Sequence, residues 1–124
     1  MTTAQRAHQI SSFAASLGFD WNCPADVLDK LQEELNEIRQ ALLNRDSIEH
    51  VQEEVGDLYF ALVNFNRKMG IDSDTAFLHG VTKFERRFHA LEQMVLQSGR
   101  SLSDMSQDEL EEVWKLVKKG EQNG

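Results

Sequence analysis

The chain has 124 residues, and its 21 Asp and Glu outnumber its 13 Lys and Arg, which gives a formal net charge of -8 at pH 7. This length favours one domain. The acidic balance argues against a nucleic-acid partner, because nucleic-acid binding usually requires a basic surface. It does not exclude nucleotides, since a metal ion and a few local cations can hold a phosphate.

The apolar runs of the sequence are far too short to span a membrane. The first residues, MTTAQRAHQISSF, lack the basic region and the apolar stretch of a secretory signal. The single cysteine, Cys23, excludes a disulfide framework within the chain and a Cys-x-x-Cys metal site. We therefore expect a cytoplasmic protein without a membrane partner.

Helical patterns account for nearly the whole chain. Apolar residues recur three and four positions apart, and no segment alternates for long enough to predict a strand. Capping residues and glycines mark the helix ends. Five helices are predicted, at residues 3–17, 24 to about 44, after 46 or 47 to 69, 73 or 74 to just before 99, and from the capping-box sequence at 106–109 onward.

The connections between these helices are only a few residues long, which favours antiparallel neighbours. We therefore predict an all-α, four-helix-bundle-like fold of about five helices, with helices two to four at its centre. The predicted domain covers residues 1–124, with a core at about 3–118 and a frayed tail at 119–124. A bundle this small can bury an apolar face against another copy, so we expect a homodimer formed through the bundle.

Two short acidic runs interrupt the apolar stripes of the second and third predicted helices. Glu34 and Glu54 fall on these stripes, and each is followed three residues later by another acid, Glu37 and Asp57 respectively. Residues three and four apart share a helix face. If the two helices pack antiparallel through their stripes, the four carboxylates converge. Their mutual repulsion then requires compensation, and a cation is one way to supply it.

A solvated acidic surface is the alternative explanation. It suits Glu33 and Glu53, which point further from the stripes, better than it suits Glu34 and Glu54. No Glu in the chain is followed three residues later by His, so the pattern does not fit the di-iron bundles. Oxygen ligands alone favour Mg2+, or Mn2+, as the ion.

Three further features suit a nucleotide, although each has a simpler explanation. Lys83 and Arg87 lie one turn apart on the fourth predicted helix, as a phosphate clamp or as part of a charged surface. Trp21 and Trp114 can stack on a base or pack in the core. Asn64, on the acidic face of the third helix, can bind a phosphate, a sugar or a neighbouring polar group.

Together these motifs resemble the MazG-type nucleoside triphosphate pyrophosphohydrolases of the all-α NTP pyrophosphatase superfamily. The resemblance covers most of the chain and is strongest to the C-terminal domain of two-domain MazG proteins. It rests on GFDW, LDKLQEELNEI, VQEEVGDLYFALVN, KFERRF, SGRSL and LEEVWKLVK. It implies Mg2+-dependent cleavage of a nucleoside triphosphate between the α and β phosphates, and a dimer or an oligomer built from dimers.

The resemblance also implies roles for individual residues. The matched positions are Glu34, Glu37, Glu54 and Asp57 as catalytic metal ligands, Lys83 and Arg87 as the cations that hold the triphosphate, and Trp114, Trp21 and Asn64 near the nucleoside. Three alternatives stay open. They are a related pyrophosphatase specific for dUTP, dCTP or phosphoribosyl-ATP, a non-catalytic helical interaction module, and a simple metal buffer.

Overall fold

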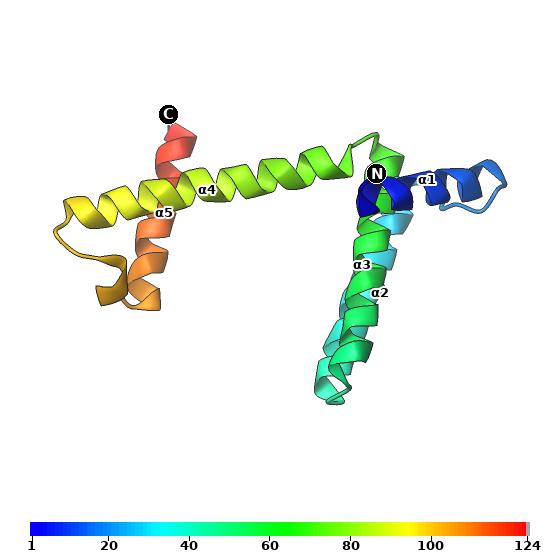
Figure 1. Ribbon diagram of the computed structural model, residues 1–124, viewed down its shortest axis with the longest axis horizontal. Helices are drawn as coiled ribbons and strands as arrows, with labels where there is room; N and C mark the ends of the chain where they lie inside the picture. Colours follow the sequence, from blue (N-terminus) through cyan, green and yellow to red (C-terminus); the bar gives the residue numbers. More distant parts are fainter. Residues whose placement is uncertain (124) are drawn as a thin grey trace. The chain divides into compact units, whose positions relative to one another are not determined.

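The computed structural model describes residues 1–123, and its secondary structure over that range is entirely helical (Figure 1). This confirms the all-α prediction. The helices are α1 (Thr3–Ser16), α2 (Pro24–Leu43), α3 (Ile48–Met69), α4 (Ser73–Gln97), the short 3-10 helix η1 (Leu102–Asp104) and α5 (Gln107–Asn123).

Local capping sets most helix ends where the sequence predicts them. Gly18 follows α1 with a φ of 91°, and Gly70 ends α3 with a φ of 72°, a left-handed conformation that glycine adopts without a steric penalty. At the start of α5 the Ser106 hydroxyl accepts from the Glu109 N–H, and the Glu109 carboxylate accepts from the Ser106 N–H, each at 3.1 Å. This is the predicted capping box.

The chain divides into two compact units. The N-terminal unit, Met1–Ala76, contains α1, α2, α3 and the first turn of α4, and the C-terminal unit begins at Phe77 and contains the rest of α4, η1 and α5. The prediction of one domain over residues 1–124 stays a prediction.

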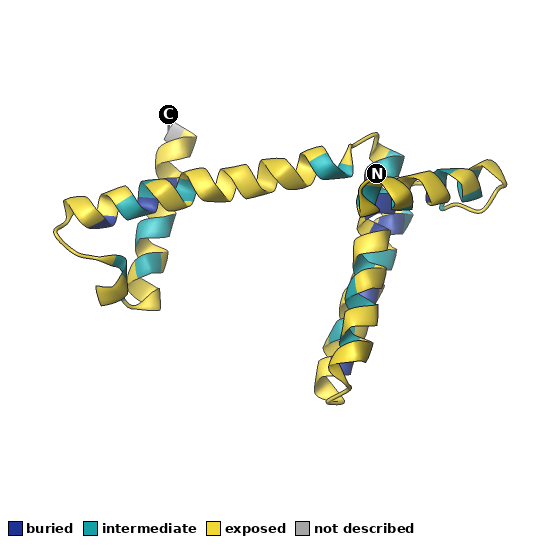
Figure 2. Ribbon diagram, in the orientation of Figure 1, coloured by how far each residue is buried: buried dark blue, intermediate teal, exposed yellow. Residues whose placement is uncertain are grey.

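In the N-terminal unit α2 and α3 lie side by side as an antiparallel pair, and α1 packs against α3 (Figure 1). The turn between α2 and α3 is only four residues long, which enforces this pairing. Val27 and Ala41 of α2 and Ala61 of α3 are buried, and Figure 2 shows buried segments along this helix pair. Small side chains at these positions let two backbones approach closely, which brings other residues of both stripes into reach.

The core of the C-terminal unit forms between α4 and α5. Leu91 and Val95 of α4 are buried against Val117 of α5. Trp114 packs on the same cluster, and its ring lies 5.5 Å from that of Phe84, centroid to centroid.

Helix α5 continues to Asn123, through most of the segment predicted to be a frayed tail. Ion pairs explain the difference, because the Glu121 carboxylate accepts from Arg86 Nε at 3.2 Å and from Arg87 Nε at 2.7 Å. Residue 124 lies outside the described residues. Within the described range no helix combines the length and the apolar character needed to cross a bilayer.

Candidate metal centre and its neighbouring cavity

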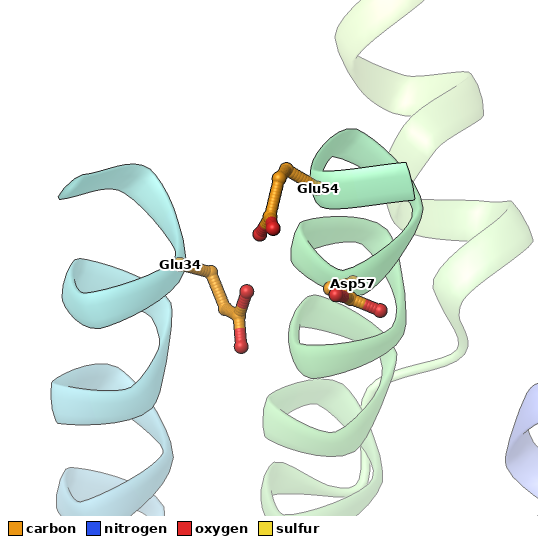
Figure 3. A group of neighbouring side chains, drawn as sticks. All are labelled: Glu34, Glu54 and Asp57. Atoms are coloured by element: carbon orange, nitrogen blue, oxygen red, sulfur yellow. The ribbon is translucent and has the colours of Figure 1, made fainter. Parts of the chain in front are cut away.

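Glu34 on α2 and Glu54 and Asp57 on α3 form an acidic cluster (Figure 3). One carboxylate oxygen from each residue lies within 4.8 Å of the others. The side chains of Glu34 and Glu54 project toward each other between the two helices. The antiparallel packing of the two stripes therefore brings together three of the four carboxylates that the sequence singled out.

The carboxylates of Glu34 and Glu54 are buried without enough donors to satisfy them. Glu34 is 5 % exposed, and the side chain of Glu54 is 15 % exposed. The Oε2 atom of each residue is buried and has no hydrogen-bond partner. A buried acceptor without a partner is costly, and more so when it carries charge. Oxygen ligands in this state fit a hard divalent cation.

Glu37, the fourth carboxylate, lies at the exposed edge of the cluster. Its contact with Glu54, together with partial loss of solvent, raises the pKa of Glu37 above its ordinary value. A neighbouring carboxylate has this effect because it disfavours a second negative charge. Glu37 thus neighbours Glu54 but is not one of the three clustered residues, and its role as a metal ligand stays a prediction.

A lysine and a histidine flank the acids. Lys30 Nζ lies 3.1 Å from Glu34 Oε1 and 3.4 Å from Glu33 Oε1, and the bond to Glu34 raises the pKa of Lys30. His50 Nε2 lies 3.6 Å from Glu54 Oε1. Lys30 was not among the predicted site residues, although its position four residues before Glu34 indicates a helical ion pair.

Two cavities of the N-terminal unit adjoin this region. A cavity of about 350 Å3 is lined by acidic residues that include Glu33, Glu37 and Glu54. A larger cavity of about 630 Å3 is mostly apolar, and Lys30 lines it together with residues of α1, the α1–α2 loop and α3. Lys30 thus belongs to the larger cavity and also pairs with the acidic cluster.

The larger cavity brings together two of the residues predicted to lie near a nucleoside, Trp21 and Asn64. Asn64 is 1 % exposed, and its side chain is held at both ends. Its amide donates to the Phe60 carbonyl at 3.0 Å, and its carbonyl accepts from Arg67 at 3.2 Å. The polar Asn64 in a mostly apolar wall is a feature typical of ligand pockets.

The other predicted substrate residues lie in the C-terminal unit. Lys83 is exposed on α4, and Arg87 is partly buried and bound to Glu121. Trp114 lines an apolar cavity of about 540 Å3 with Phe84. The acidic cluster and these residues fall in different units, so their predicted convergence in one site stays a prediction.

Comparison with protein families identifies a conserved domain. Residues 24–91 match the family model of the MazG nucleotide pyrophosphohydrolase domain. The matched segment covers more than half of the chain and contains the acidic cluster, Lys83 and Arg87.

Three curated relatives place the chain among named bacterial proteins. It is 38 % identical over 120 residues to the nucleoside triphosphate pyrophosphohydrolase of Escherichia coli K12, and 34 % identical over 116 residues to the nucleoside triphosphate pyrophosphohydrolase/pyrophosphatase MazG of Thermotoga maritima. Each alignment covers 94 % of the chain and 44 % of the relative. The uncharacterized protein YabN of Bacillus subtilis is 35 % identical over 72 residues, which are 58 % of the chain and 15 % of that relative. The chain thus spans less than half the length of these relatives.

Proposed function

The chain belongs to the MazG nucleotide pyrophosphohydrolase domain family, and from this premise we propose that it hydrolyses nucleoside triphosphates, NTP or dNTP, at the α–β phosphate bond in a Mg2+-dependent reaction. The products would be a nucleoside monophosphate and pyrophosphate. One observation carries the proposal beyond family membership. Two buried carboxylate oxygens, on Glu34 and Glu54, face the same cluster and have no donor.

Glu34, Glu54 and Asp57 would hold the cation, with Glu37 joining them from the exposed edge. Mg2+, when bound there, supplies positive charge to phosphate oxygens and lowers the pKa of water. The carboxylates fix the place at which phosphate oxygens bind. Lys30 stands beside this place through its bond to Glu34, where its ammonium group would be available to a phosphate.

The reaction transfers the α phosphoryl group to water. The water oxygen forms a bond to the α phosphorus, the bond from that phosphorus to the α–β bridging oxygen breaks, and pyrophosphate leaves with the electron pair. The proton of the water passes to a carboxylate and then to solvent. Of the two outward acids, Glu33 lines the acidic cavity beside Glu54 and is the better placed to orient the water. Lys83 and Arg87 would stabilise charge on the departing pyrophosphate.

The larger cavity is the proposed place of the nucleoside. Asn64 lies seven residues after Asp57 on α3, which is about 10 Å along the helix. A nucleotide with its phosphates at the acidic cluster would therefore reach Trp21 and Asn64 with its sugar and base. Trp114, in the C-terminal unit, is the second aromatic candidate for contact with the base.

We also propose that the protein acts as a homodimer or as an oligomer built from dimers. Large apolar side chains remain exposed at helical spacing on α4, among them Phe77, Val81, Phe84 and Phe88. Monomeric proteins rarely leave contiguous apolar surface of this kind uncovered. A second copy would cover it, and the molar mass in solution tests this.

A panel of NTPs and dNTPs, assayed for pyrophosphate release with and without Mg2+, tests the proposed activity. We expect pyrophosphate release that requires Mg2+. Its rate should fall by at least about a hundredfold in Glu54→Gln, because that change removes a ligand of the cation. Glu53→Gln is the matched control, because it removes a negative charge from the neighbouring residue. The side chain of Glu53 is 79 % exposed. The Glu53→Gln variant should keep the activity.

The panel also separates the alternatives. Release from one base alone would assign a base-specific enzyme. No release from any nucleotide, together with no Mg2+-dependent stabilisation, would leave a non-catalytic module. Tight cation binding that does not depend on Lys83 or Arg87, without hydrolysis, would leave a metal buffer.

A further inference from the structure

The loop between α1 and α2 is tied to the C-terminal end of α3 by an ion-pair network. The Asp20 carboxylate accepts two hydrogen bonds from Arg67, with Nη2 at 2.5 Å from Oδ1 and Nη1 at 3.3 Å from Oδ2. The side chains of Asp20 and Arg67 are largely buried. A planar guanidinium bound to a carboxylate through two parallel bonds fixes orientation as well as distance.

Lys68 adds a second anchor on the same loop. Its Nζ lies 3.1 Å from Asp20 Oδ2 and donates to the Trp21 carbonyl at 2.8 Å. The Trp21 N–H donates in turn to Asp20 Oδ1 at 2.9 Å. The Trp21 backbone is therefore held at both its N–H and its carbonyl.

Arg67 also contacts Asn64, which lines the larger cavity from α3. The Nη2 atom of Arg67 donates to Asn64 Oδ1 at 3.2 Å, so one guanidinium joins Asn64 to Asp20. Asp20, Trp21 and Asn64 all line the cavity, whereas Arg67 is outside its lining. Arg67 can thus influence what binds in the cavity only through the residues that it holds.

We propose that Arg67 is a positioning residue for nucleoside recognition, because its guanidinium holds Asn64 directly and Trp21 through Asp20, and both residues line one cavity. The proposal rests on the proposed function for the identity of the ligand. The geometry that supports the proposal does not depend on the proposed function, because the ion-pair network alone defines it. Loss of the guanidinium removes one of the two anchors of the α1–α2 loop, leaving Lys68 as the other, and leaves the Asn64 carbonyl without its donor.

The expected kinetic effect falls on binding and selectivity. Arg67 lies ten residues beyond Asp57, about 15 Å along α3, so its removal leaves the acidic cluster in place. For Arg67→Gln we expect KM to rise about tenfold while kcat changes by less than about threefold, the pattern for lost binding common to the ground state and the transition state. The differences in kcat/KM between nucleotides with different bases should become smaller as well.

Three variants make the test specific. Arg67→Lys keeps the charge but cannot form the two-pronged contact, so it should restore little. Asp20→Asn should raise KM like Arg67→Gln, and the double variant should add little to either, because both changes break the same contact. Arg100→Gln is the matched control. Its guanidinium clamps Glu109 and the Asp104 carbonyl, both within the C-terminal unit, and its loss should leave KM and base preference unchanged.

A second readout does not use the reaction. In a Trp114→Phe background the remaining indole is that of Trp21, and its quenching by acrylamide should increase when Arg67→Gln is added, in the absence of any nucleotide. Unchanged quenching would overturn the positioning role, as would unchanged KM and base preference in an Arg67→Gln protein that is merely less stable. If the wild type releases no pyrophosphate from any nucleotide, the proposed function fails, and the quenching experiment still decides the positioning role.

Discussion

Glu34→Gln should stabilise the metal-free protein, although it removes the ion pair between Glu34 and Lys30. Two unit charges 4.8 Å apart repel by about 3.5 kcal/mol at an effective dielectric constant of roughly 20, and this separation is the upper limit within the acidic cluster. The lost contact with the partly exposed Lys30 offsets about 0.5 kcal/mol of the relief. The new amide can also donate to Glu54. We expect the free energy of unfolding to rise by about 1–3 kcal/mol.

Urea denaturation followed by circular dichroism measures this effect, first in EDTA and then in excess Mg2+. At a hundredfold excess over its dissociation constant, Mg2+ should stabilise the wild type by about 2.7 kcal/mol through mass action. The Glu34→Gln variant lacks a metal ligand, so its higher free energy of unfolding relative to the wild type should disappear in Mg2+. Glu33→Gln removes a neighbouring charge outside the cluster and should change the stability by less than about 0.5 kcal/mol in either buffer. A Glu34→Gln protein that is less stable than wild type in EDTA would refute the reasoning.

Three further perturbations test the fold around the site. The Arg67 guanidinium lowers the pKa of Asp20 from 3.8 to about 2, so the stabilisation by Asp20 is complete above its unfolded pKa and is lost as the pH falls toward the folded value. Asp20→Asn should therefore cost about 1 kcal/mol at pH 7 after allowance for solvent screening, and should flatten stability against pH below about 4 in urea titrations. Ser47→Ala removes the hydroxyl that caps α3 and should cost about 1 kcal/mol in the same titrations at pH 7. Val27→Ala opens space at a fully buried position and should cost about 2 kcal/mol, whereas a change under about 0.5 kcal/mol would contradict the packing of α2 on α3.

The helix boundaries were predictable because their signals are local. Glycines at 18 and 70 and the capping box at Ser106 act within one helical turn, so a single sequence contains all the information that they need. The end of α5 was not predictable in the same way. Its helical tail depends on Glu121 meeting arginines 34 and 35 residues earlier, and no local pattern contains such a pair.

The same distinction applies to the candidate site. The stripe positions of Glu34 and Glu54 predicted their convergence, because a short turn allows the two helices only one arrangement. The clamp of Asp20 by Arg67 joins residues 47 positions apart, and nothing in the spacing of either residue indicated it. The carboxylate oxygens without hydrogen-bond partners and the cavity beside them likewise depend on three-dimensional side-chain packing, which no local sequence pattern specifies.

Hydrolysis of a nucleoside triphosphate in 18O-labelled water, with Mg2+, tests the central claim most directly. Product analysis by mass spectrometry locates the bond that breaks. Attack at the α phosphorus predicts that the label appears in the nucleoside monophosphate and that unlabelled pyrophosphate is released, with neither product formed in EDTA. Label in orthophosphate or in pyrophosphate, or turnover that persists in EDTA, would contradict the account.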